Sequence, residues 1–163
     1  MVMRKEHIKV KSRKLYLAII AYLLTSLGLH AEMQGAAWYF SAGHTLFEQG
    51  QYADAIAAFN QAVEKQPFNS NYHHWLGKSY GRLAEISGWF KAMDLSRKTL
   101  AELELAVELD ENNTAALVDL MAYYEQAPAF LGGNQEKANE IQKKLDKIQT
   151  QNMSQSLEED SDR

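Results

Sequence analysis

The sequence contains no cysteine, and only two prolines and nine glycines among its 163 residues. Without cysteine there can be no disulfide, thiolate metal site, cysteine nucleophile or lipid-modified cysteine of the bacterial type. The scarcity of helix-breaking residues, together with long stretches of Ala, Leu, Glu, Lys and Gln, favours an all-α fold over a sandwich or barrel. A chain of this length suits one modest domain with terminal segments.

Positive charge is scarce as well, except near the N-terminus. The chain has 17 basic and 21 acidic residues, a net charge of −4. Six basic residues and one acidic residue lie within residues 1–31, which leaves 11 basic and 20 acidic residues, a net −9, for residues 32–163. Because phosphate binding needs concentrated Lys and Arg, this acidic body argues against general nucleic-acid binding.

The N-terminal segment has the layout of a secretory signal. A basic stretch, "KVKSRK", leads into the uncharged apolar run "LYLAIIAYLLTSLGL" at residues 15–29. The run is shorter than the roughly 20 residues that span a bilayer comfortably, which favours cleavage after Ala31. The alternative is an uncleaved membrane anchor. Both place the body outside the cytoplasm, exported to the periplasm or anchored to the inner membrane.

A pattern of small and large apolar residues begins at Ala36. Small residues recur where two antiparallel helices would cross, and large residues recur where they would fill the space between them. Gly50 is placed to cap the first helix in a left-handed conformation, and Pro67 to end the second. The positions that carry the pattern are Tyr39, Gly43, Ala55, Phe59 and Ala62.

The pattern returns twice along the chain. The first copy covers residues 36–69. A second copy begins at Ser70 and ends at Asn113, so it is about ten residues longer than the first, and we expect the extra residues to lie between its two helices. A third copy begins at Thr114. It departs from the pattern at "APAFLGG", where Pro128 should stop one helix and Asn134 should cap the next. Residues 150–163 are polar and acidic without periodicity, and we expect them to be disordered.

These residues resemble the tetratricopeptide repeat (TPR) family, and the "APxFLGG"-type loop is similar to one in small exported bacterial members. The resemblance implies an all-α, right-handed solenoid of about three helical hairpins over residues 36–148. The hairpins would cover residues 36–69, 70–113 and 114–148, the second with its insertion. It also implies a non-catalytic scaffold, without a cofactor, that binds a protein or peptide partner.

In this family, the first helices of successive repeats line a concave groove. Carried onto this chain, the lining forms an aromatic edge beside a basic centre, which implies a partner that is acidic or contains aromatic residues. The third repeat would add Val118, Glu125 and Gln126. The lysine–asparagine clamp of some family members is not supported, since Phe40 and His44 stand in its place. The implied peptide-binding residues are Phe40, His44, Phe47, Asn71, His74, Lys78 and Arg82.

The adjacent histidines His73 and His74 support an alternative, a metal-binding or enzymatic subunit. Neighbouring residues on a helix point about 100° apart, however, and neither histidine has a His or Cys partner at i+4. We therefore predict no metal site and no catalytic residues. One histidine should lie near the core and the other in the groove.

Large apolar residues in the second and third repeats have two interpretations. Trp89, Phe90 and Met93 in the insertion either fold back over the hairpins or form an exposed anchor for a partner or a membrane surface. Phe130 and Leu131 in the last loop carry the same alternatives. We expect both groups to pack against the hairpins.

Overall fold

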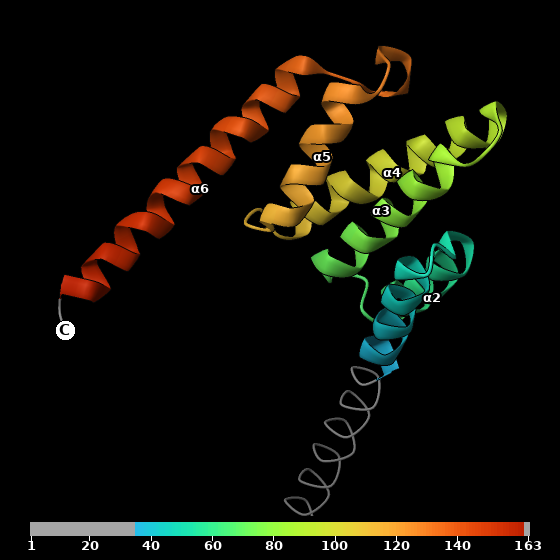
Figure 1. The fold of residues 1–163 in the computed structure, drawn as a ribbon, viewed down its shortest axis with the longest axis horizontal. Helices are drawn as coiled ribbons and strands as arrows, with labels where there is room; N and C mark the ends of the chain where they lie inside the picture. The colour runs from blue at the N-terminus through green and yellow to red at the C-terminus, as the bar shows by residue number, and fades with distance from the viewer. Residues whose placement is uncertain (1–34, 162–163) are drawn as a thin grey trace, which may run out of the picture.

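The computed structural model describes residues 35–161, so the predicted export segment at residues 1–31 lies outside the described residues. Within them the fold is all-helical, as predicted, and the helices form a stack of hairpins (Figure 1). The first described helix covers residues 35–48. It is followed by α2 (Tyr52–Lys65), α3 (Ser70–Glu85), α4 (Trp89–Leu109), α5 (Thr114–Gln126), the 3-10 turn η1 (Ala129–Leu131) and α6 (Gln135–Ser161).

The first hairpin closes where the sequence predicts. Gly50 has φ +74°, the left-handed cap that ends the first described helix. Gly43 lies directly beneath Phe59 of α2, which is completely buried. Next to this crossing, Phe59 packs with Ala55 and with Leu76 of α3, so one apolar cluster joins the first hairpin to the second.

The insertion in the second repeat lengthens its helices instead of forming a separate segment between them. The helices α3 and α4 contain 16 and 21 residues, and only residues 86–88 connect them. Helix-forming residues fill both sides of this connection, so added helical turns satisfy their backbone groups internally. The extra turns carry the end of this hairpin beyond the neighbouring helices (Figure 1). Here Trp89 and Phe90 are exposed, which corrects the expectation that they fold back over the hairpins.

The third hairpin is closed by the predicted turn residues. α5 ends at Gln126, before Pro128, and Gly132 adopts φ +101°. The Asn134 side chain accepts hydrogen bonds from the backbone N–H groups of Glu136 and Lys137 at 3.0 and 3.1 Å, which caps α6. A second core cluster, made by Leu103, Leu120, Tyr124 and Ala138, joins α4, α5 and α6.

The expectation of disorder from residue 150 is wrong for residues 150–161, which continue α6. This stretch lacks both glycine and proline. The hydroxyls of Thr150 and Ser154 donate to the carbonyl oxygens four residues earlier, at 2.8 and 3.0 Å. The polar composition that suggested disorder is therefore compatible with a solvated helix, which extends beyond the stack (Figure 1). Among the helices of residues 35–161, none has the length and apolarity that a bilayer crossing requires.

Candidate peptide-binding groove

The predicted aromatic edge forms at the face shared by the first described helix and α3. Phe40 stacks on Tyr72 of α3 with ring centroids 4.8 Å apart. The ring centroids of His44 and Trp75 are 3.8 Å apart. The Phe47 ring contacts the same indole edge-on, with the centroids 5.2 Å apart. These contacts place the three predicted first-helix residues on one surface. We call Phe40, His44, Phe47 and Trp75 the aromatic section.

The aromatic section is only half-buried, so part of each ring remains open to a partner. Phe40 and His44 also line an open hollow of about 610 Å³ along the outer edge of their helix. Trp75 contacts both His44 and Phe47 but is not among the residues predicted to line the groove.

The predicted basic centre is a set of balanced ion pairs. Lys78 Nζ lies 3.2 Å from Asp119 Oδ2 of α5, and Arg82 Nη1 lies 2.6 Å from Glu85 Oε2 within α3. Two positive and two negative side chains therefore share the site. We call Lys78, Arg82, Glu85 and Asp119 the charged section. It lines a hollow of about 350 Å³ between α3, α4 and α5.

His74 is not available to a partner, which corrects its assignment to the groove. It is only 3% exposed, and its Nε2 lies 2.7 Å from Asp119 Oδ2. Burial alone would raise the pKa of the Asp119 carboxyl, but the hydrogen bond from His74 and the positive charge of Lys78 lower it. Asp119 is thus held ionised between the two side chains and ties α5 to α3.

His73 is also buried, and it faces a different helix. Its Nδ1 lies 2.7 Å from Glu102 Oε2 of α4, and its Nε2 lies 2.9 Å from the Pro67 carbonyl oxygen. Because both neighbours accept hydrogen bonds, both ring nitrogens donate only in the protonated imidazole. The hydrogen bond to Glu102 raises the pKa of His73 against the opposing effect of burial. Both histidines are therefore buried, contrary to the expectation that one lies in the groove.

The two histidines thus have separate carboxylate partners on separate helices. Within residues 35–161, no group of three or more His, Cys, Asp or Glu side chains is arranged to hold a metal ion. The remaining second-repeat residue, Asn71, is exposed and accepts a hydrogen bond from Asn113 Nδ2 at 3.2 Å. It therefore lies at the end of the groove, beside the α4–α5 connection.

The third repeat contributes less to the groove than predicted. Gln126 lines the hollow of the charged section, but Val118 lines a different hollow, between α5 and α6. Val118 is 47% exposed, and the hollow that it lines is shared with α6 residues. The described groove therefore lies mainly on the first two repeats and the α3-facing side of α5.

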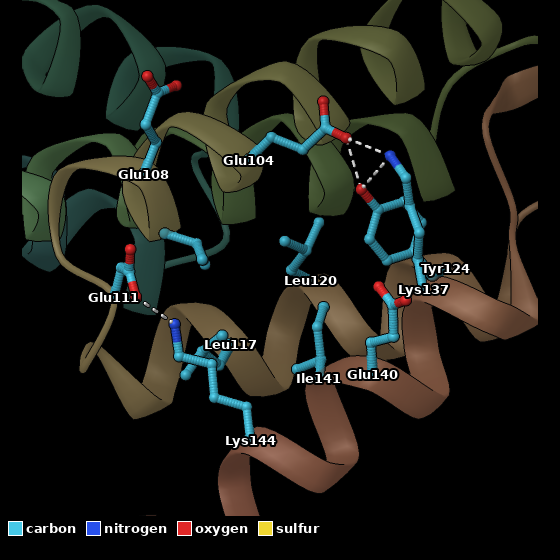
Figure 2. Close-up of a pocket in the computed structure, with 11 residues that line it drawn as sticks. Glu104, Glu108, Glu111, Leu117, Leu120, Tyr124, Lys137, Glu140, Ile141 and Lys144 are labelled. Carbon is cyan, nitrogen blue, oxygen red and sulfur yellow. Dashed lines mark hydrogen bonds and ion pairs between the residues drawn. The ribbon is translucent and has the colours of Figure 1, made fainter.

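A further hollow of about 580 Å³ separates α4 from α6 (Figure 2). Leu117, Leu120 and Ile141 form its apolar floor. Two ion pairs cross it: Lys137 Nζ to Glu104 Oε1 at 3.2 Å and Lys144 Nζ to Glu111 Oε2 at 3.0 Å. Both pairs are solvent-exposed, so each is worth at most about 1 kcal/mol.

One comparison with known proteins, the one with family models, supports the repeat pattern. Residues 43–83 match the family model described as TPR repeat, which confirms the predicted tetratricopeptide repeat over that stretch. Among solved structures, the chain is similar to the first TPR of Spaghetti (RPAP3) bound to HSP90 peptide SRMEEVD. The two are 25% identical, 77% of this chain and 97% of that chain are covered, and the TM-score is 0.47. No curated protein matches the chain significantly.

The matched stretch runs from Gly43 through α2 into α3. It therefore contains the crossing of the first hairpin, three of the four residues of the aromatic section, and Lys78 and Arg82 of the charged section. Residues 43–83 are therefore similar to a tetratricopeptide repeat. The exported bacterial subtype stays a prediction from the sequence.

Proposed function

We propose that this protein is a non-catalytic interaction scaffold that binds a peptide or partner protein in the groove along the first described helix, α3 and α5. The observation that carries the proposal is the aromatic section. Four half-buried rings from two successive repeats form one surface next to a hollow lined by charged side chains. Aromatic residues with an apolar body and an exposed edge are the usual anchors of protein interfaces.

The partner segment is acidic or contains aromatic residues. Lys78 lies over the Trp75 ring, 5.3 Å from its centroid, at the junction of the aromatic and charged sections. Its ammonium group has three donors, so a ligand carboxylate can join Asp119 there, while an aromatic ligand side chain packs on Trp75. Arg82 is half-exposed, and exchange of Glu85 for a ligand carboxylate costs little at such a site.

The scaffold acts outside the cytoplasm, in the cell envelope. The support is the sequence of residues 1–31, with its basic leader and apolar run at residues 15–29. Cleavage after Ala31 would release the protein into the periplasm, whereas retention of the run would tether it to the inner membrane. A reporter that is active only after export, fused after residue 40, tests this part separately. Activity of a cytoplasmic reporter instead would contradict it.

Site-directed photo-cross-linking tests the groove. A photoreactive phenylalanine analogue replaces Phe47 in the full chain, and the matched control replaces Ala57, which is exposed on α2. We expect a discrete cross-linked product from position 47 and none from position 57. Equal products from both positions, or a product from position 57 alone, would contradict binding in the groove.

Neutral substitutions test the charged section. Lys78→Glu would place two carboxylates together at Asp119, so Lys78→Gln with Arg82→Gln perturbs the fold less. We expect the double variant to bind the cross-linked partner several-fold more weakly, with a smaller salt dependence. Lys143→Gln with Lys147→Gln is the matched control, since these exposed lysines have the same spacing on α6 and no ion pair among the described residues. Equal affinities of the two double variants would show that the charged section does not contribute to partner binding.

A further inference from the structure

A second surface lies at the end of the hairpin formed by α3 and α4. Ile86, Trp89 and Phe90 are 69%, 66% and 88% exposed. All three lie within five consecutive residues around the short connection, and we call these three residues the hairpin tip. Neighbouring exposed large apolar residues are uncommon on a soluble surface and mark a site of contact.

The tip is an addition to the repeat and serves no purpose in the hairpin core. The buried residues of α4 begin at Leu95, more than one turn after Phe90. An added side chain at Gly88 would meet no atom within 4 Å, so the connection is open on that side. The turns beyond the core therefore carry these apolar side chains into solvent. They lie where the α3–α4 hairpin extends past its neighbours (Figure 1).

The charge around the tip is opposite to that of the rest of the body. Residues 82–98 contain four basic and two acidic residues, a net +2, whereas residues 32–163 together carry −9. Arg82 pairs with Glu85 and Lys98 with Asp94, so both acidic residues are neutralised. The cations left without an ion pair among the described residues are Lys91 and Arg97. The first turn of α4 has no acidic side chain.

We infer that the hairpin tip docks onto the surface of an anionic lipid bilayer, a contact separate from the proposed groove. Tryptophan and phenylalanine insert at the boundary of headgroups and acyl chains, and basic residues beside them bind anionic headgroups. The combination of exposed aromatic residues with a local positive charge fits that boundary. The surrounding negative body is repelled by the same surface, so only the tip approaches it.

Cysteine labelling tests this inference without background, because the chain has no cysteine. Phe90→Cys in the full chain carries an environment-sensitive fluorophore, and Ala57→Cys on α2 is the control. Each protein is reconstituted into vesicles of phosphatidylcholine and into vesicles that also contain phosphatidylglycerol. Both labelled proteins contain residues 15–29, so any membrane insertion of that segment affects the two labels equally. We expect the label at position 90 to shift to the blue and become shielded from iodide in the anionic vesicles only, while the label at position 57 stays accessible.

Charge variants of the labelled protein give the second measurement. The double variant Lys91→Gln with Arg97→Gln should lower the ratio of docked to undocked protein about thirtyfold. The reason is that each basic residue near an anionic surface contributes about 1 kcal/mol to binding. Lys143→Gln on α6 should leave it unchanged. A label at position 90 that stays accessible to iodide in anionic vesicles overturns the inference. Shielding that is equal in neutral vesicles, or that rises with protein concentration, also overturns it and indicates instead a contact between proteins.

Discussion

Substitution of Gly43 by alanine should destabilise the protein although alanine is the better helix former. An ideal Cβ at this position would lie 2.7, 2.8 and 3.0 Å from three ring carbons of Phe59, and the first two distances are shorter than real Cβ contacts. The Phe59 side chain is completely buried and is flanked by the Phe40 and Trp75 rings, so it has no free space to enter. Overpacking of this kind costs about 1–3 kcal/mol.

The matched control is Gly81→Ala on α3. A Cβ there would meet Thr99 at 3.5 Å, an ordinary contact, so the gain in helix propensity, up to about 1 kcal/mol, should appear undiminished. Urea unfolding followed by circular dichroism measures both variants. We expect Gly43→Ala to be less stable than Gly81→Ala by about 1–3 kcal/mol, and Phe59→Leu to relieve part of the loss in a double variant. Equal stabilities would refute the close crossing of the first hairpin.

Three further results are expected. Because the hydrogen bond to Glu102 raises the pKa of His73, its stabilising contribution should be complete below about pH 6.5 and be lost as the pH rises through the raised value. Urea unfolding at a series of pH values should show this loss in the native protein and not in Glu102→Gln; identical pH profiles would be evidence against the protonated pair. Gly133→Ala would place a Cβ 1.7 Å from the Ala127 carbonyl oxygen, so amide exchange in α6 should accelerate strongly, whereas native-like protection of α6 would show that the loop tolerates the methyl group. Asn113→Ala removes the cap of α5 and should lower the free energy of unfolding by about 1–2 kcal/mol, and an unchanged value would mean that the cap contributes nothing.

The features that the sequence predicts well are local ones. Gly50, Pro128 and Asn134 act on the backbone within a few residues, and each ends or caps a helix where expected. The small residues of the repeat pattern were equally informative, because Gly43 and Ala62 must be small wherever two helices cross closely. Local turn chemistry and helix periodicity therefore carry most of the fold.

The details of the groove depend on distances between repeats, which the sequence does not encode locally. Asp119 lies 45 residues after His74, and only the packing of α5 on α3 reveals that it buries His74 and neutralises Lys78. The insertion is ambiguous for a similar reason. A surplus of ten residues can fold back or lengthen two helices, and the apolar side chains of Trp89 and Phe90 are compatible with both.

The most direct test of the proposed groove uses the indole N–H signals of Trp38, Trp75 and Trp89 in a nitrogen–proton correlation spectrum. Only Trp75 lies in the aromatic section, whereas Trp38 and Trp89 are exposed on other surfaces. The titrant is the partner segment recovered by cross-linking at position 47, and Trp→Phe variants assign the signals. We predict that the Trp75 signal shifts in a saturable manner while the other two stay in place. A shift confined to Trp38 or Trp89, or no shift at saturating titrant, would contradict binding in the groove.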